Sequence, residues 1–434
     1  MYKQYLKQAW NLIRQEKLFS SVYIIGTGLS ITIVMVLSIV LYLKIANIYP
    51  ETNRDRMLVV RPAAEIRGED DMSKWYLSYR TVNTCFYPLE SAEAVTAVFD
   101  RYMERYVQSV GSDNQWPVVV KYIDHNFWRV FPFRFVGGKP FTEADWRSGI
   151  YTAVITETLS RKVFGTIEAE GQYINLDFRP YRVAGVVKDA SMITSSTYAD
   201  MWIPFTLMPD YLREFGEENT VGPFAAYLLA PSAAAKDIEM VKREAQENVR
   251  KYNSSMPENV EFSISSQPDL YWQSLFRINK MDVDFLRIGM IYGLIFLVLL
   301  LVPAINLSGM TDSRIERRLA ELGVRRAYGA QNMQLLRQIL YENMFFSFLG
   351  GIIGLLGSYL FIIIGRSWIM QIGQDVSFLP PEGTEVILTP GMLLNVHVFL
   401  IALAICFLMN FLSAFIPAWH ASRREIVHSL NSKI

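Results

Sequence analysis

The chain has very little cysteine and no net charge. Its 434 residues include only Cys85 and Cys406, one in a polar region and one inside a long apolar run, so we expect no disulfide between them. CxxC and Cys/His metal spacings are absent. Lys plus Arg and Asp plus Glu both total 42, so no global attraction to nucleic acid is implied. We therefore expect neither a metal site nor a nucleic-acid partner.

The chain also lacks the motifs of an ATPase or a hydrolase. No G-x-x-x-x-G-K-(S/T) phosphate loop occurs, and Gly137 to Pro140 lacks both the upstream glycine and the hydroxyl residue of such a loop. No serine between Ser191 and Thr197 has a G-x-S-x-G context. His125 has no second ligand at metal spacing, which favours a structural role. We predict a protein that is not an enzyme and binds no cofactor itself.

Some polar and aromatic clusters have simple structural interpretations. Glu69 to Asp71 is predicted to be a solvated acidic loop, and Ser191 to Thr197 a polar, irregular one. The remaining cluster is aromatic, and core packing is favoured over contact with a partner for most of its members, which are Trp75, Tyr76, Phe127 and Trp128.

Long apolar runs are abundant. Hydrophobic residues make up 51% of the chain and the mean hydropathy is positive, which is typical of a membrane protein. The fold class predicted is a membrane protein with four transmembrane α-helices and a large mixed α/β extracytoplasmic domain between the first and second. Each run is long enough to cross a bilayer. The predicted spans are 21–43, 283–307, 339–365 and 391–417.

The inserted domain, 44–282, is predicted to be an α/β subdomain split around a β-rich middle at about 127–204. In the middle, we expect a turn at Val136 to Gly138, a helix ending at Gly165 and a hairpin at Tyr173 to Asp189. The flanking parts suggest two strand–helix–strand units. Their strands are expected at Arg56 to Pro62, Trp116 to Tyr122, Phe224 to Leu229 and Val260 to Ile264, and their helices at Leu89 to Val110 and Ala233 to Lys251.

Basic residues indicate the orientation in the membrane. Residues 1–20 are predicted to form an amphipathic helix in contact with membrane lipid on the cytoplasmic side. The region 308–338 and the tail 418–434 are also basic, whereas the loop 366–390 contains only one basic residue. The distribution predicts a protein of the cytoplasmic (inner) membrane with both termini in the cytoplasm and the loop outside.

A charged helix is expected between the second and third spans, from Arg314 to Ala330. Ile315, Leu319, Leu322 and Tyr328 would share one face, with Arg318, Glu321 and Arg325 on the other. Gly329 lies where a left-handed C-cap is expected, and Arg325 and Arg326 lie near the negative end of the helix dipole. The pattern alone also fits a solvated helix between spans.

The third span carries two further features. Gly350, Gly354 and Ser358 recur every four residues, a pattern that lets helices approach closely in lipid. Glu342 is an ionisable residue near its inner end. Two interpretations of Glu342 remain open: a charge that couples motions, or a residue that is locally paired, for example with Arg337 or Asn343.

Several of these segments resemble one family. RRLAELGVRRAYGA, Arg317 to Ala330, is similar to the E-x-G-(I/V)-R-(K/R)-A-x-G-A segment of FtsX-like permeases, the MacB-type membrane subunits of ATP-binding-cassette transporters. Ile416 to Leu430 resembles the family's carboxy-terminal motif, although Ile426 stands where many relatives have proline. The stretch after the charged helix also matches the family, at Gln338, Leu340, Glu342, Gly350, Gly351 and Gly354. The segments that resemble the MacB-type periplasmic core domain are Phe133 to Asp145, Val154 to Gly165 and Tyr181 to Asp189.

The resemblance implies partners. A cytoplasmic ATPase subunit would bind ATP and Mg²⁺, and a second permease, identical or paralogous, would complete the assembly. The charged helix would be the coupling helix that docks in the ATPase, and its apolar face suits such a partner. The residues predicted to couple are Ile315, Arg318, Leu319, Glu321, Leu322, Gly323, Arg325, Arg326 and Gly329.

The spans contain few ionisable residues, which favours mechanical transmission over a hydrophilic solute path. The leading hypothesis is a permease that exports a peptide, lipoprotein or amphiphile, with or without a periplasmic adaptor. One alternative is an FtsX-like regulator of an extracytoplasmic cell-wall hydrolase. Another is a membrane sensor that works without ATP.

Overall fold

A computed structural model of the chain describes residues 10–423 except 12, 16, 69–70, 100–102, 112, 209–218, 278–282, 318–323, 326 and 372–395. The chain divides into two compact units. The helical unit comprises Met1–Tyr42, Leu286–Ile369 and Thr389–Ile434, and the globular unit comprises Leu43–Phe285 with Met370–Leu388. Most of the predicted interfacial helix, outer loop and tail lies outside the described residues.

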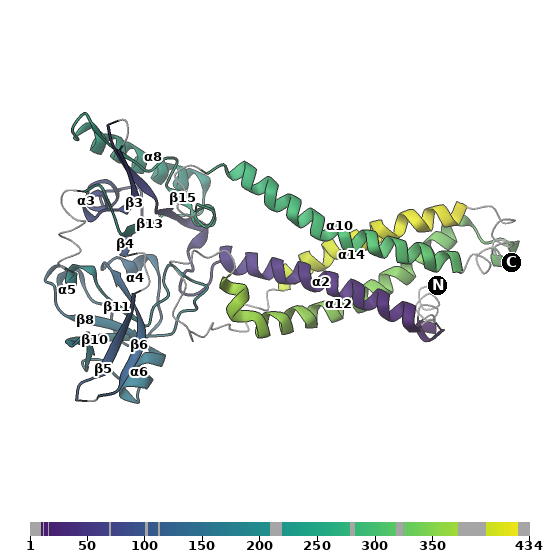
Figure 1. The fold of residues 1–434 in the computed structure, drawn as a ribbon, viewed down its shortest axis with the longest axis horizontal. Coiled ribbons are helices and arrows are strands. Elements are labelled where there is room, and N and C mark those ends of the chain that lie inside the picture. The colour runs from purple at the N-terminus through teal and green to yellow at the C-terminus, as the bar shows by residue number, and fades with distance from the viewer. Residues whose placement is uncertain are drawn as a thin grey trace. The chain divides into compact units, whose positions relative to one another are not determined.

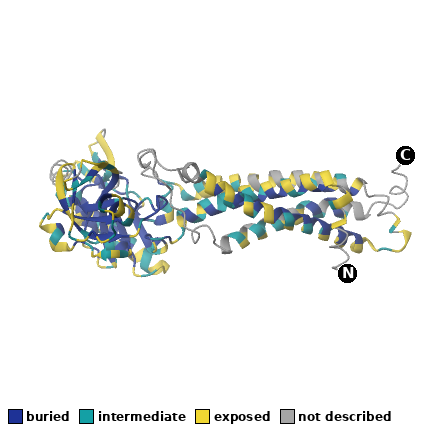
Figure 2. Ribbon diagram, turned by 90° about the horizontal axis from the view of Figure 1, so that it is seen from below, coloured by how far each residue is buried: buried dark blue, intermediate teal, exposed yellow. Residues whose placement is uncertain are grey.

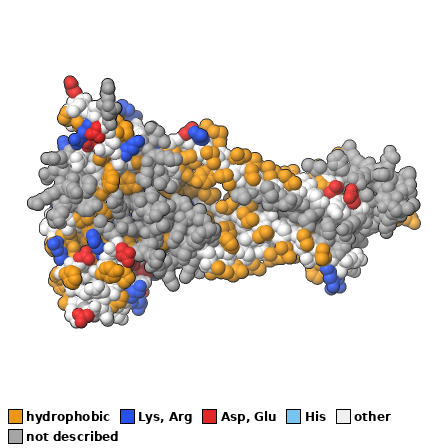
Figure 3. Space-filling model, in the orientation of Figure 1, with side chains coloured by type: hydrophobic (Ala, Val, Ile, Leu, Met, Phe, Trp, Pro, Cys, Tyr) orange, Lys and Arg blue, Asp and Glu red, His pale blue; other side chains and the backbone are white. Residues whose placement is uncertain are grey.

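In the part of the chain that the structure describes, the helical unit contains four long helices (Figure 1): α2 (Lys17–Ile45), α10 (Phe285–Arg317), α12 (Asn332–Gln371) and α14 (Val396–Arg423). Within the described residues, Ser20–Ile45 and Asn332–Gly365 are long and apolar enough to cross a membrane, and α10 contains a shorter apolar stretch, Phe285–Val298. Apolar side chains cover much of the visible surface of these helices (Figure 3). Many residues of the helices are exposed (Figure 2), and they include large apolar ones such as Leu286, Leu356 and Ile364. An apolar surface of this extent suits a lipid environment.

Half of the globular unit is a closed β-barrel. Strand β5 pairs with β6, β6 with β11, β11 with β8, β8 with β10, β10 with β9, and β9 again with β5. Alternate side chains such as Val107, Ile174 and Val183 are fully buried, as a closed barrel requires. The strands are β5 (Met103–Ser109), β6 (Gln115–Ile123), β8 (Thr152–Thr156), β9 (Tyr173–Leu176), β10 (Arg179–Val187) and β11 (Met201–Pro204).

Short elements decorate the barrel. Strand β7 (Phe135–Gly138) pairs with β10 outside the ring, and the helices are α4 (Phe127–Val130), α5 (Glu143–Arg147) and α6 (Glu157–Phe164). Thr142 begins α5 with a capping box, and Gly165 ends α6 at a positive φ of 73°. The helix ending at Gly165 and the hairpin of β9 and β10 are confirmed.

The other half of the globular unit is an α/β layer, labelled in the upper part of the unit in Figure 1. Its sheet includes β4, β13, β1 and β15 in that order, and β2 pairs with both β3 and β14. The strands are β1 (Met57–Val60), β2 (Ala63–Arg67), β3 (Asp71–Leu77), β4 (Ala94–Phe99), β12 (Val221–Gly222), β13 (Phe224–Leu229), β14 (Val260–Ser263) and β15 (Asp269–Leu270). The helical segments are η1 (Arg54–Arg56), α3 (Tyr79–Thr81), η2 (Val82–Phe86), η3 (Phe205–Leu207), α8 (Ala235–Ser254) and α9 (Tyr271–Ser274).

The predicted helix at Leu89 to Val110 is wrong. This stretch contains β4 and β5, separated by residues outside the described set. All six residues of β4 are buried, and Val95, Thr96 and Val98 are β-branched, which suits a fully buried strand better than an amphipathic helix. Because β5 and β6 belong to the barrel, the β-rich part begins before residue 127.

One smaller prediction also differs from the structure. The predicted turn at Val136 to Gly138 is part of β7, which pairs with β10 through a β-bulge. Ser191 to Thr197 is irregular, as predicted, but mostly buried, because Arg54, Arg61 and Lys121 donate hydrogen bonds to it. The second strand–helix–strand unit, β13 with α8 and β14, is confirmed.

Candidate functional site

The predicted coupling segment is described only in part. Helix α10 ends at Arg317, and of the predicted coupling residues Arg318, Leu319, Glu321, Leu322, Gly323 and Arg326 lie outside the described residues. Ile315, Arg325 and Gly329 are described. Gly329 has a φ of +92°, and the Ala330 N–H donates to the Arg325 carbonyl at 3.0 Å, so the chain leaves this helical segment through a left-handed cap, as predicted.

A chain of hydrogen bonds joins the coupling segment to α12. The Arg325 guanidinium donates to Gln338 Oε1 at 2.7 Å, and Gln338 Nε2 donates to Glu342 Oε1 at 3.0 Å. Gln338 and Glu342 are one turn apart and buried. Glu342 thus has a hydrogen-bond partner within its own helix. Through Gln338 it is connected to Arg325, which is predicted to contact the ATPase.

Ile315 faces the inside of the permease. Its side chain is only 5% exposed and packs with residues of α12 and α14, namely Leu335, Leu336, Ile339 and Ala418. The structure therefore gives Ile315 a packing role in place of the direct partner contact expected from the sequence. A buried side chain cannot serve both purposes without opening the cluster.

Exposed apolar residues lie beside this cluster. Tyr328, in the turn before α12, is 89% exposed, and Val324 and Met333 are also exposed. Together with Arg325 they surround the cap at Gly329. The combination of aromatic, aliphatic and guanidinium groups is typical of surfaces that bind another protein.

The helices near Glu342 also bury polar atoms that have no hydrogen-bond partner within the described structure. These are Asn343 Oδ1 in α12 and Thr311 Oγ1 in α10. Since Ile315 packs against Leu335 to Ile339 and the two helices run in opposite directions, Thr311 lies at the level of Glu342 and Asn343. Polar groups therefore gather at one level of the helical unit.

Small residues bring α12 into close contact with α2. A Cβ atom added at Gly354 would lie 2.7 Å from Ile31 Cβ, and one at Gly350 would lie 2.8 Å from Thr27 Cβ. The Thr32 hydroxyl lies 3.2 Å from the Gly354 carbonyl, across the helix pair. Ser358 is buried and donates back to Leu355 in its own helix. The two helices thus form a tight pair.

We call residues 43–60, which begin in the last turn of α2, and residues 264–277, which precede α10 in the chain, the base of the globular unit. A buried ion pair stabilises this base. Arg54 and Glu51 lie 2.8 Å apart, and neither side chain is exposed. Arg54 also donates to the carbonyls of Leu43 and Ala46 at 2.9 Å, which satisfies the last turn of α2. Its guanidinium lies 4.7 Å from the ring centre of Tyr271 in α9. Burial raises the pKa of Tyr271, which hydrogen bonds to Glu51 and stays neutral.

A second buried ion pair precedes α10. Arg277 pairs with Asp269 and donates to Ser266 Oγ at 2.7 Å, and both charged side chains are almost fully buried. Its guanidinium lies 5.6 Å from the ring centre of Phe285, the first residue of α10. Asp269 lies in β15, which pairs with β1 directly after Arg54 to Arg56. The chain leaving α2 and the chain entering α10 are therefore fixed to the same sheet.

The buried stretch Ser191 to Thr197 is hydrogen-bonded to this base. Lys121 Nζ donates to the carbonyls of Ser195 and Ser196 at 2.9 and 2.7 Å. Thr197 Oγ1 donates to Glu51 at 3.1 Å. The barrel loop is thus tied to the ion pair that caps α2. Sequence reasoning missed it because a run of Ser and Thr resembles a solvated loop unless its cationic partners are known.

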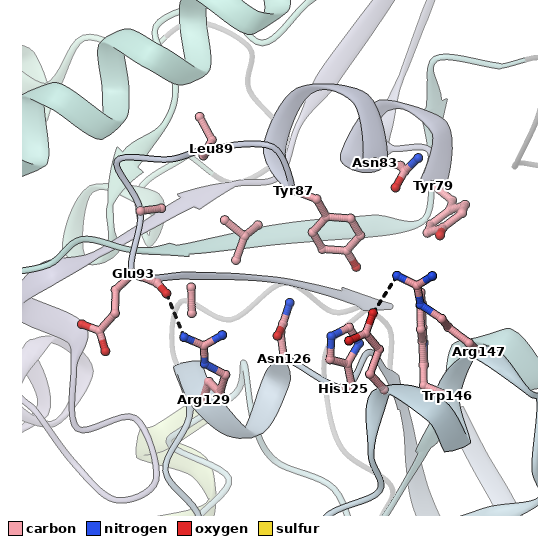
Figure 4. A pocket seen from close by; sticks show the side chains of 14 residues that line it. Tyr79, Asn83, Tyr87, Leu89, Glu93, His125, Asn126, Arg129, Trp146 and Arg147 are labelled. Atoms are coloured by element: carbon pink, nitrogen blue, oxygen red, sulfur yellow. Dashed lines mark hydrogen bonds and ion pairs between the residues drawn. The ribbon is translucent and has the colours of Figure 1, made fainter.

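The globular unit also has a cavity between its two halves. It has a volume of about 510 Å³, and its lining includes Tyr79, Asn83, His125, Arg129, Trp146 and Arg147 (Figure 4). His125 packs on Trp146 with 5.2 Å between ring centres, in keeping with its predicted structural role. Nothing in the sequence pattern marked this cavity, because its lining comes from three separate stretches of the chain, 79–95, 125–129 and 143–147.

The remaining candidates are a cysteine, possible metal ligands and aromatic residues, and in the described residues they form no catalytic or metal site. Cys85 is a buried free thiol, and burial raises its pKa to about 12, so it is not a reactive nucleophile at neutral pH. Among the described residues, no group of three or more His, Cys, Asp or Glu side chains is arranged to hold a metal ion. Phe127 is fully buried, as core packing predicts, whereas Trp75 is 42% exposed.

Two family models match the chain. Residues 20–247 match the MacB-like periplasmic core domain, and residues 293–426 match the FtsX-like permease C-terminal region. Both matched regions are permease parts, and neither is an ATPase domain.

Curated relatives are distant. The chain is 25% identical over 233 residues to the pyoverdine export ATP-binding/permease protein PvdT of Pseudomonas fluorescens (strain Pf0-1), covering 54% of this chain and 33% of PvdT. It is 22% identical over 244 residues to the uncharacterised ABC transporter permease YknZ of Bacillus subtilis (strain 168), covering 56% of this chain and 57% of YknZ. The chain therefore spans between a third and three fifths of these two relatives.

Some solved structures are similar to about half of the chain. The periplasmic region of MacB from Actinobacillus actinomycetemcomitans is 14% identical, with 50% of this chain and 94% of that one covered and a TM-score of 0.33. The extracellular domain of the noncanonic ABC-type transporter YknZ from Gram-positive bacteria is 16% identical, with 47% and 99% covered and the same TM-score, 0.33. Since the core-domain model alone matches more than half of the sequence, the chain belongs to the FtsX-like permeases with a MacB-like periplasmic core domain, a family of ABC transporter permeases.

Proposed function

We propose that this chain transmits ATP-driven motion from a separate ATPase subunit to its extracytoplasmic domain. In this proposal the four long helices all cross the membrane, both termini are cytoplasmic, and the globular unit lies outside. ATP and Mg²⁺ bind the ATPase, and a second permease, identical or paralogous, completes the assembly. Both matching family models are permease regions, which supports placing ATP binding on a separate subunit.

The observation that carries the proposal is the hydrogen-bond chain from Arg325 through Gln338 to Glu342. It ties the segment predicted to dock on the ATPase to a helix of 40 residues, which is roughly 60 Å long. A displacement of Arg325 is thereby passed to α12 through charge-assisted bonds in a buried setting. Farther along, the contacts at Gly350 and Gly354 pass it to α2.

The globular unit is built to receive such motion. Arg54 holds the last turn of α2 from Leu43 onward, and Arg277 holds the chain just before α10. Both are joined to the sheet through β1 and β15. A movement of either helix end therefore acts on the whole base of the unit and not on a loose linker.

The work done outside is proposed to be export of a peptide, lipoprotein or amphiphile, with or without a periplasmic adaptor. The name of PvdT describes export of pyoverdine, which supports an export role for a relative of this chain. Mechanical control of a cell-wall hydrolase uses the same transmission and is the second candidate. A sensor that works without ATP would not need an ATPase-binding surface such as the one proposed around Gly329.

The first test is affinity purification of the native chain in mild detergent, with mass spectrometry of its partners. An ATPase at near-equal stoichiometry is expected, and the external protein that accompanies it distinguishes export from hydrolase control. Leu319→Asp combined with Leu322→Asp should abolish ATPase association, whereas Tyr106→Asp, on an exposed barrel strand, should not. Association that survives the double substitution would show that the docking assignment is wrong.

The second test concerns Glu342. Glu342→Ala removes the end of the hydrogen-bond chain and should leave ATP hydrolysis in place while the movement of the globular unit is lost. Glu316→Ala, at an exposed position near the end of α10, is the matched control. Normal coupling in the Glu342→Ala complex would remove this residue from the transmission path.

A further inference from the structure

The cavity between the barrel and the α/β layer has the form of a ligand site. Its roof comes from α3, η2 and the start of β4, and its floor from α4 and α5 with the residues just before α4 (Figure 4). Its volume of about 510 Å³ lies within the range of small-molecule sites. A molecule bound there would contact both halves of the globular unit.

Cationic and polar groups lie along the floor. Figure 4 shows Arg129, Asn126, His125 and Arg147 in a row, with Asn126 and His125 pointing towards the roof. Arg129 donates to the Glu93 backbone carbonyl at 3.2 Å, and Arg147 pairs with Glu143 at 2.6 Å with both side chains largely exposed. Each guanidinium has five N–H donors, so both keep donors for a ligand.

Two lining groups lack protein partners. Within the described residues, the side-chain amides of Asn83 and Asn126 form no hydrogen bond, whereas the unpaired Trp146 Nε1 and His125 Nδ1 are buried and do not open onto the cavity. Unpaired polar groups in the lining of a cavity are typical of a site that is completed by a ligand or by water.

The balance of charge indicates the kind of ligand. Glu143 offsets part of the charge of Arg147, and Glu93 is already paired with Arg56. The lining thus suits one negative charge better than the two of a phosphate. Tyr79, Leu89 and Trp146 add apolar and aromatic surface for the rest of the molecule.

We propose that this cavity binds an amphipathic organic anion through its carboxylate, which Arg129 holds at one end of the row while the apolar body extends past Asn126 and packs on Tyr79 and Trp146 at the other. Guanidinium groups bind carboxylates through paired, charge-assisted hydrogen bonds, which supplies the specificity. The site goes beyond the proposed function, because binding requires neither an ATPase nor transport.

The test uses the full chain in lipid nanodiscs, without any ATPase. The probes are a library of N-acetylated tripeptides with free carboxylates and the same library as carboxy-terminal amides. Bound peptides are separated by rapid gel filtration and quantified by mass spectrometry. The acids should be retained at least about tenfold more than the amides, since a hydrogen bond to a charged group is lost with the charge.

Variants locate the site. Arg129→Gln should lower retention of the acids by about tenfold, whereas Arg182→Gln, at an exposed position of the barrel, should not. Inorganic phosphate at equal concentration should leave the acids bound. Equal retention of acids and amides, no retention of either, displacement by phosphate, or unchanged retention in Arg129→Gln would overturn the proposal. Any of these results would leave the permease assignment untouched.

Discussion

The two units of this protein fix their shape by different means. The globular unit buries whole charges, Arg54 with Glu51 and Arg277 with Asp269, and binds Lys121 to a buried loop. In the described part of the helical unit, close contact between small residues of α2 and α12 holds the helices instead. There a group of buried polar residues lies around Glu342, at the level of Thr311 and Asn343.

This difference follows from the two solvents. In lipid, association of helices gains nothing from burying apolar surface, so backbone approach and van der Waals contact must supply the stability. In water, the globular unit can pair charges across segments that are far apart in sequence. Arg54 follows the end of α2 and Arg277 precedes α10, so under the proposed mechanism each unit would use its own chemistry to remain rigid while motion passes through it.

The strongest way to break the comparison is Arg54→Met. The substitution leaves Glu51 buried without its partner and frees the carbonyls of Leu43 and Ala46, so the globular unit should lose about 3–5 kcal/mol of unfolding free energy. The measurement is urea unfolding of the full chain in nanodiscs, followed by hydrogen exchange in β1 and β13.

Arg161→Met is the matched control, because the pair of Arg161 with Glu157 is partly exposed and should contribute less than about 1 kcal/mol. If the two substitutions had equal effects, the buried clamp at Arg54 would not be a source of stability.

The helical unit is tested by Gly354→Ile. The new side chain would clash with Ile31 and the Gly28 carbonyl, and overpacking of this kind typically costs about 1–3 kcal/mol. Gly26→Ile is the control, since a Cβ there meets nothing within 4 Å. Unfolding of the helices in a titration with SDS measures both, and a Gly354→Ile variant as stable as the control would contradict the close contact.

A smaller effect, the lowered pKa of Glu65, tests how charges stabilise the globular unit. Burial of Glu65 raises its pKa, but hydrogen bonds from Thr220 and Arg67 outweigh this and lower the pKa overall. A lowered folded-state pKa adds stability above the unfolded value, roughly 4.3, and this stability is lost as the pH falls through the folded value.

Glu65→Gln should therefore destabilise the globular unit by about 1 kcal/mol at pH 7 and flatten its loss of stability below pH ~4.5. Unfolding measured at several pH values checks both. An unchanged slope in acid would show that Glu65 is not stabilised as an anion.

Much of the architecture could be predicted from the sequence, because apolar runs and β-branched segments are local signals. Strand β13 and the hairpin of β9 and β10 are examples. Strand β4 was predicted as a helix because AVTAVF can form either element, and pairing with β13, which is distant in sequence, decides between them. The closed barrel likewise depends on long-range pairing, such as that of β6 with β11.

The site was predictable only where it is local. Glu342 stands out as a charge in an apolar run, and Gly329 as a helix cap, but the bond between Arg325 and Gln338 depends on how the chain turns back. Ile315 fitted an exposed helix face until the contacts with Leu335 and Ala418 were known. No local sequence pattern predicts the contact between Arg54 and Tyr271, because the two residues are more than two hundred positions apart.

The most direct test of the account is hydrogen exchange on the complex of this chain with its ATPase in nanodiscs, with and without ATP. Exchange should change at the base of the globular unit, in residues 43–60 and 264–277, and the change should vanish in Glu342→Ala while ATP is still hydrolysed. ATP hydrolysis by the wild-type complex with no change of exchange anywhere in the globular unit would contradict the claim that this chain transmits the motion.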